Sequence, residues 1–147
     1  MNLATLLQAR YDAQAPDSTA EPARWTAVID QMLAHRSVRR HKPEPVTDAQ
    51  LSALVAAAQS AASSSNLQVW SVVDVSDADT KARLADCAGG QGHVAAAPVV
   101  LMWLVDLARL EAVAQDLNLP HAALDSLEMF LVGAIDAALA AQNAMLA

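Results

Sequence analysis

The chain has 147 residues, a single cysteine and a formal net charge of −7, and 54% of its residues are hydrophobic. This length predicts one domain with a substantial core, and the hydrophobic content excludes a disordered tail. The lone cysteine excludes an intrachain disulfide framework and a cysteine-based zinc site, which suits a reducing cytosol, so we expect a cytoplasmic protein.

The pattern of the first third of the chain predicts helices, followed by an extended basic segment. Apolar residues at helical spacing predict a helix over 2–13, and after a loop a second helix starts at Pro22 and ends at His35. The prolines at 43 and 45 make the next segment extended. Thr47 and Gln50 form a capping-box pattern that opens a third helix.

Two strands and several helices follow. The third helix ends in a run of small polar residues over 60–66, which hydrogen-bond locally instead of continuing a helix. Val99 to Val105 is apolar throughout, which predicts a strand buried on both faces. The other predicted elements are a strand over 69–75, a helix over 77–87 closed by Gly89-Gly90, and helices over 107–117 and from 122 onward, with Pro120 at the break.

The positive charge of this acidic chain is concentrated in one place. Four of the nine Lys and Arg residues, Arg36, Arg39, Arg40 and Lys42, fall within seven positions. A solvated turn at a helix C-terminus, a phosphate site and a nucleic-acid patch would each explain this cluster. The acidic balance and the 3% aromatic content disfavour nucleic acid, so the turn and the phosphate site stay open on this evidence.

The last predicted helix is apolar enough to raise the question of a membrane span. Asp136 lies in its middle, and a central Asp costs about 2.5–3.5 kcal/mol on insertion, so we expect a buried helix of a soluble fold. The helix shows neither a C-cap glycine nor a basic last turn before Ala147. We therefore expect the chain to be a truncated piece of a longer protein.

Conventional catalytic constellations are missing from the sequence. The four histidines are scattered without ligand spacing, so we expect no metal site. There is no G-x-S-x-G, and Gly89-Gly90-Gln91-Gly92 matches neither a P-loop nor a dinucleotide fingerprint. We therefore expect no catalytic side chain.

Three motifs in order carry a resemblance to a known family. They are His-Arg-Ser-Val-Arg at 35–39, Ser-Ser-Ser-Asn-Leu-Gln at 63–68 and Gly-Gly-Gln-Gly-His-Val-Ala at 89–95. On these motifs the chain resembles the FMN-dependent nitroreductase family, in its NADPH-preferring oxygen-insensitive nitroreductase and flavin reductase branch. The resemblance covers residues 25–147 and leaves 1–24 as an N-terminal helical extension.

The resemblance implies an α+β fold, in which helices flank a mainly antiparallel sheet and a long central helix forms a homodimer interface. It implies FMN as the cofactor. His35, Arg36, Ser37 and Arg39 would hold its phosphate and ribityl chain. Ser63, Ser64, Ser65, Asn66 and Gln68 would line the isoalloxazine ring, partly from across the dimer interface, and Gln91 would hydrogen-bond the flavin.

The implied function is transfer of hydride from NAD(P)H through FMN to nitroaromatics, quinones or free flavin, without nucleic acid or membrane. The cofactor would perform the redox chemistry, which agrees with the shortage of catalytic side chains. The family continues with a glycine-rich flavin-contacting segment, a distal phosphate contact and a C-terminal arm, which this sequence lacks. The alternative is therefore a truncated, non-catalytic nitroreductase-like dimer with weak or no flavin binding.

Overall fold

The computed structural model describes residues 3–12 and 26–147. They belong to two compact units, one that ends at Val38 and one that begins at Arg39, and each is described by itself. The first unit contains α1 (Leu3–Tyr11) and α2 (Ala27–Ala34). The predicted helix over 2–13 is confirmed for its described part. The predicted helix start at Pro22 and the domain boundary after residue 24 lie outside the described residues.

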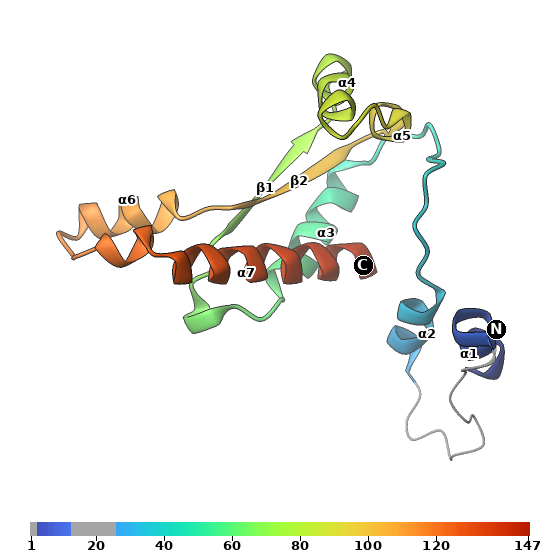
Figure 1. The fold of residues 1–147 in the computed structure, drawn as a ribbon, viewed down its shortest axis with the longest axis horizontal. Helices are drawn as coiled ribbons and strands as arrows, with labels where there is room; N and C mark the ends of the chain where they lie inside the picture. The colour runs from blue at the N-terminus through green and yellow to red at the C-terminus, as the bar shows by residue number, and fades with distance from the viewer. Residues whose placement is uncertain (1–2, 13–25) are drawn as a thin grey trace. The chain divides into compact units, whose positions relative to one another are not determined.

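The second unit is built on a two-stranded antiparallel sheet. Strands β1 (Trp70–Val75) and β2 (Val100–Val105) pair so that Trp70 lies opposite Val105. Figure 1 shows α4 and α5 at one end of these strands and α6 at the other. The remaining elements are α3 (Asp48–Gln59), η2 (Ser64–Asn66), α4 (Ala78–Cys87), α5 (Gly92–Ala96), α6 (Ala108–Asp116), η3 (Ala122–Asp125) and α7 (Leu127–Leu146). The predicted α+β class is confirmed.

Local capping fixes the helix ends where the sequence predicts them. The Gln50 N–H donates to Thr47 Oγ1 at 3.3 Å, and the Thr47 N–H donates to Gln50 Oε1 at 2.9 Å, which confirms the capping box of α3. At the end of α4, Gly89 and Gly90 have φ of +81° and +75°. This left-handed conformation, which glycine adopts without strain, turns the chain out of the helix.

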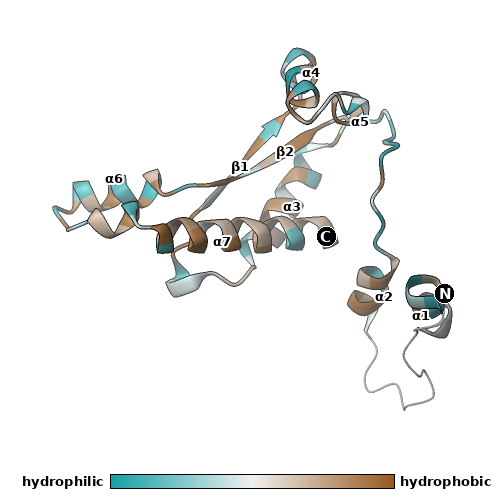
Figure 2. Ribbon diagram, in the orientation of Figure 1, coloured by the Kyte–Doolittle hydropathy of each residue, from teal (hydrophilic) through white to brown (hydrophobic). Residues whose placement is uncertain are grey.

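The core lies between α3, α7 and one face of the sheet. Ala58, Ala140 and Ala144 form its buried centre, because small side chains let the two helices approach closely. Trp70 and Trp103 cover this centre from the strands, with ring centroids 5.4 Å apart and a 47° angle between the rings. This tilted arrangement is favourable for aromatic pairs. Figure 2 shows the hydrophobic residues concentrated along β1, β2 and α7.

Gly133 is the point where α7 comes closest to the sheet. A Cβ atom at this position would lie 2.4 Å from Val105 Cγ1 and 3.3 Å from the Val69 carbonyl oxygen. Both distances are shorter than ordinary van der Waals contact, so only glycine permits this approach. The contact places the middle of α7 beside the segment that enters β1.

The sequence prediction for residues 99–105 is wrong in one respect. The segment forms β2, but its residues are half-buried, and Leu104 is 41% exposed. The reason is that α3 and α7 cover one face of the sheet, and Val73 on the neighbouring strand is also exposed. The helix predicted from residue 122 onward is likewise interrupted, because a 3-10 turn over 122–125 precedes α7.

In the part of the chain that the structure describes, α7 is the one helix long and apolar enough to cross a bilayer. Its buried residues, which include Gly133, Asp136 and Ala140, form one stripe along the helix. The opposite stripe is apolar and exposed, with Leu131 at 52%, Ile135 at 59% and the related residues Leu127 and Leu139. The helix is therefore buried on one face only within this chain.

We predict that Gly133→Ala destabilises the protein, although alanine favours helix formation by about 1 kcal/mol relative to glycine. The added methyl group collides with Val105, and overpacking of this kind typically costs about 1–3 kcal/mol. Urea unfolding measures the effect. The double variant Gly133→Ala/Val105→Ala should be more stable than the two single effects predict, because the new methyl group occupies the space that Val105 leaves. Strict additivity would contradict the close contact.

A second prediction concerns Asp106, which follows β2. The hydrogen bond from the Ser71 hydroxyl, aided by the Arg109 N–H and charge, holds the pKa of Asp106 below its ordinary value. A depressed folded-state pKa stabilises the protein above the unfolded pKa of about 3.9 and loses this contribution as pH falls through the folded value.

Without this hydrogen bond, the folded-state pKa of Asp106 lies closer to its unfolded value. As the pH falls from about 5 to about 2, the free energy of unfolding should therefore decrease less in Ser71→Ala than in the parent protein. The pKa of Asp77 is also lowered, chiefly by hydrogen bonds from Thr80, but that contribution is common to both proteins. Urea midpoints measured across this pH range give the comparison. Parallel pH profiles would show that the Ser71 contact does not act on Asp106.

Candidate functional site

The polar segment 63–68 has an unusual backbone. Ser65, Asn66 and Gln68 have φ of 51°, 55° and 50°, which is the left-handed region. Residues with a Cβ atom adopt this region rarely, at a cost of about 1–3 kcal/mol each. Three such residues among four positions persist only where surrounding contacts hold them, and such strain is concentrated at functional sites.

The contact that holds the segment comes from α7. Asp136 is 2% exposed. Its Oδ2 accepts the Ser63 hydroxyl at 2.6 Å and the Val69 N–H at 3.3 Å, and its Oδ1 accepts the Ser64 N–H at 3.4 Å. A buried carboxylate needs such donors, because leaving water without them is very unfavourable. The carboxylate therefore ties both ends of the segment to one helix.

Hydrogen bonds hold the backbone N–H, the carbonyl oxygen and the side-chain amide of Gln68. Its N–H donates to Ser63 Oγ at 2.7 Å, and its side-chain Nε2 donates to Asn66 Oδ1 at 3.2 Å. Its carbonyl oxygen accepts the Arg109 guanidinium from α6 and the Trp70 N–H at 2.9 Å. The predicted ring-contacting residues 63–68 are thus brought together in one ordered loop.

The loop presents polar groups on its outer side. Ser64, Ser65 and Asn66 are exposed, whereas Ser63 and Gln68 are half-buried. Beside the loop lies a hollow of about 380 Å³, lined by Ala62, Ser63, Ser64, Val132, Ile135, Asp136 and Leu139. Apolar walls and hydroxyl groups therefore meet at this end of the sheet, next to the exposed stripe of α7.

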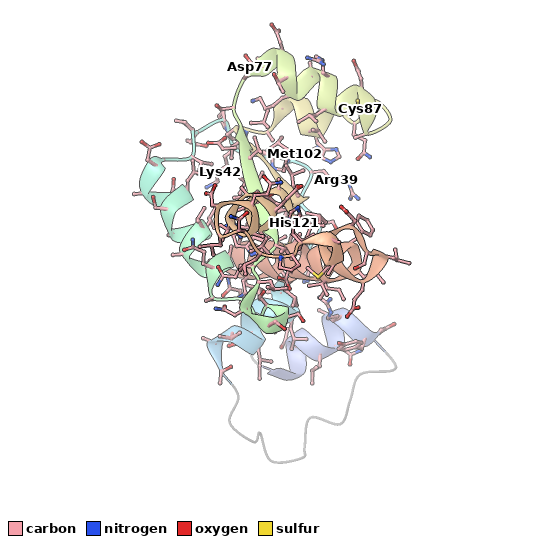
Figure 3. All side chains as sticks on the ribbon, turned by 90° about the vertical axis from the view of Figure 1, so that its left-hand side faces the viewer. Arg39, Lys42, Asp77, Cys87, Met102 and His121 are labelled. Atoms are coloured by element: carbon pink, nitrogen blue, oxygen red, sulfur yellow. The ribbon has the colours of Figure 1, made fainter. Side chains whose placement is uncertain are left out.

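A second cluster lies at the other end of the sheet. The rings of His41 and His93 are 6.4 Å apart and tilted by 41°, which places the basic segment that begins at Arg39 beside α5. Gln91 precedes α5 and is exposed, and its Nε2 donates to the Ala88 carbonyl at 3.0 Å. The side chains of Arg39 and Lys42 are labelled in Figure 3. The segment that contains His41 therefore lies next to α5, which Gln91 precedes in the chain.

The predicted flavin-contacting residues of one chain do not form a single cluster. Loop 63–68 precedes the first residue of β1, whereas Gln91 belongs to the α4–α5 connection that follows its last residue (Figure 1). A six-residue antiparallel strand spans roughly 20 Å. Gln91 and loop 63–68 of the same chain are therefore too far apart to contact the same ring edge.

His35, Arg36 and Ser37 belong to the first unit and are exposed. Arg36 Nη1 donates to the carbonyls of Leu33, Ala34 and His35 at 3.1–3.4 Å. Arg10 Nη1 donates to two of the same carbonyls, those of Leu33 and His35. These guanidinium groups cap the C-terminus of α2, as positive charge does at helix ends. The phosphate contacts of His35, Arg36, Ser37 and Arg39 stay predictions.

Sequence reasoning missed two residues that hold the loop. The signal for Asp136 is its place in an apolar helix, because a lone carboxylate must find donors if that helix is buried. Arg109 gave no signal, because its contact to the Gln68 carbonyl joins positions 41 residues apart. A second buried charge among the described residues, Lys81, donates to the Ala97 carbonyl at 2.6 Å and fixes α4 against the segment that enters β2.

Known proteins resemble the chain in both sequence and fold. The model of the nitroreductase family matches residues 32–147. A NADPH-flavin oxidoreductase of Vibrio harveyi is 38% identical over 119 residues, which are 81% of this chain and 48% of that protein. An oxygen-insensitive NADPH nitroreductase of Salmonella typhimurium is 39% identical over 119 residues, with the same coverage of 81% and 48%.

The structural comparison gives the same result. The solved structure of NfrA2 from B. megaterium superimposes with a TM-score of 0.80 at 34% identity, covering 83% of this chain and 50% of that one. The chain spans about half the length of the curated relatives it matches. With a family match over 32–147 and relatives above 30% identity across most of its length, the chain belongs to the nitroreductase family.

Proposed function

We propose that this chain is the FMN-binding part of an NAD(P)H-dependent oxidoreductase that reduces nitroaromatics, quinones or free flavin. Relatives described as NADPH-flavin oxidoreductase, oxygen-insensitive NADPH nitroreductase and FMN reductase support this proposal. The observation that carries it is loop 63–68, a strained polar loop tied to buried Asp136. The residues of this chain would bind and orient FMN, which would supply the hydride-transfer chemistry between the nicotinamide and the second substrate.

The donor set of this chain fits FMN. The phosphate is a dianion, and exposed arginines such as Arg39 on an acidic chain are suited to bind it. The edge of the ring carries carbonyl oxygens and nitrogens, and the loop offers Ser64 and Ser65 hydroxyl groups and the Asn66 amide on its exposed side. These are the donors and acceptors that such an edge requires.

The proposed roles of the residues are binding and orientation. His35, Arg36, Ser37 and Arg39 would neutralise and fix the phosphate end of FMN. Ser63, Ser64, Ser65, Asn66 and Gln68 would hold the ring edge from the loop, and Gln91 would donate from its own cluster. Because the loop is held on α7 and α6, its donors are oriented before the cofactor arrives, which reduces the entropy lost on binding.

We further propose that the complete site needs two copies of the chain. The loop and Gln91 of one copy lie at opposite ends of the sheet, so a partner must contribute one of them if both contact the same flavin. The exposed apolar stripe of α7 borders the loop and the hollow beside it. A helix that is apolar on both sides is stabilised when its second side is also covered.

The proposal predicts that Arg36→Ala and Arg39→Ala each weaken FMN binding about ten- to a hundredfold, because a charge-assisted hydrogen bond typically contributes about 1.5–3 kcal/mol. Titration of FMN fluorescence measures the dissociation constant. Arg83→Ala removes an exposed arginine on α4 and is the matched control. Unchanged affinity in both Arg36 and Arg39 variants would reject the phosphate assignment. NADPH oxidation with a nitroaromatic then separates an oxidoreductase from a dimer that binds flavin without turnover.

The dimer proposal predicts that Ile135→Asp converts a dimer to a monomer in sedimentation equilibrium at micromolar concentration. Ile135 is 59% exposed in the single chain, so the charge is tolerated in the monomer but opposes burial against a partner. Leu117→Asp, at a 62% exposed leucine on the α6 side, is the control and should leave the mass unchanged. A monomeric parent protein would refute the two-copy site.

A further inference from the structure

The Ser63 hydroxyl connects α7 to the backbone of Gln68. A hydroxyl group has one proton to donate and two lone pairs to accept with. Here the Ser63 hydroxyl donates its proton to Asp136 Oδ2 at 2.6 Å, and Ser63 Oγ accepts the Gln68 N–H at 2.7 Å. Because a carboxylate only accepts, Asp136 fixes the direction of the hydroxyl, and the hydroxyl presents a lone pair to the Gln68 N–H.

The connected residue is one that needs support. Gln68 has φ of 50°, and its side chain is bonded to Asn66, which has φ of 55°. Left-handed residues with side chains persist only where several contacts define them. On the N–H side of Gln68 that contact is the Ser63 hydroxyl, and on the carbonyl side it is Arg109 together with the Trp70 N–H.

We propose that Asp136 and Ser63 are positioning residues that set the backbone of Gln68, and through it the groups that loop 63–68 presents to the flavin. The inference rests on the proposed FMN site and adds two residues that act on it from inside the protein. Asp136 is 2% exposed, and both of its carboxylate oxygens accept hydrogen bonds from residues 63, 64 and 69, so we assign it a role in holding the loop.

A simple packing role does not account for this arrangement. The other buried residues of α7 are Gly133, Ala137, Ala140 and Ala144, so small apolar residues are sufficient to pack this face. A carboxylate at position 136 is instead matched to three donors from one short stretch, Ser63, Ser64 and Val69. The number and the origin of these donors point to control of the loop conformation.

The experiment compares Ser63→Ala with Ser71→Ala. Both variants remove a hydroxyl group that donates to an Asp side chain, in the first case Asp136 and in the second Asp106, and both serines are half-buried. Urea unfolding gives the loss of global stability of each variant, so that a local effect on the loop can be separated from it. We expect Ser63→Ala alone to speed amide hydrogen exchange at Gln68 and to raise the FMN dissociation constant, roughly three- to tenfold in each case.

Exchange at the Gln68 amide is followed by NMR without FMN, and FMN binding by fluorescence titration. The conservative variant Ser63→Thr keeps the hydroxyl group and should remain closer to the parent protein in both measurements than Ser63→Ala does. Ser71→Ala should leave both within about twofold of the parent, since the Ser71 hydroxyl does not contact the loop and a net hydrogen bond is small.

Two results would overturn the inference. Unchanged exchange at Gln68 in Ser63→Ala would show that the hydroxyl does not hold the loop. Faster exchange with unchanged FMN affinity would show that the held loop does not serve the flavin, while the Arg39 result still decides the phosphate site. If the parent protein binds no FMN, the proposed function itself fails, and the Gln68 exchange still decides whether Ser63 holds the loop.

Discussion

The buried carboxylate of Asp136 is the constraint on which the arrangement of this chain depends. It connects α7 to the start of β1 and to the polar loop, so the core helix, the sheet and the candidate site share one contact. Next to it, Gly133 lets the helix approach Val69 closely. A charge inside an apolar helix is unfavourable unless donors surround it, so this contact also specifies how the loop must fold.

Local patterns in the sequence were sufficient for most of the secondary structure. The capping box at Thr47 and Gln50, the glycines after α4 and the two β-branched segments all depend on neighbours in the chain, and the structure has them where the patterns predict. The burial of β2 could not be read this way. An apolar run has the same appearance whether one or both faces are covered, and which faces helices cover is decided by packing between distant segments.

In the candidate site too, features that depend on continuous sequence could be predicted, whereas contacts between distant segments could not. The three motifs, which are continuous in sequence, identified the family and the residues of loop 63–68. Sequence could not reveal that Asp136 and Arg109 hold this loop, because their contacts join segments 73 and 41 residues apart. Nor could it reveal that Gln91 lies at the opposite end of the sheet, since the order of motifs along a chain does not specify their separation in space.

The separation of the two clusters has a genetic consequence if two copies share a site. A substitution in loop 63–68 of one copy and a substitution near Gln91 of another copy would each inactivate a different one of the two contributions to a shared flavin site. When such copies pair, one of the two sites would receive both defects and the other would receive neither. Two inactive alleles could then complement each other in a mixed dimer, whereas two alleles altered in the same cluster could not.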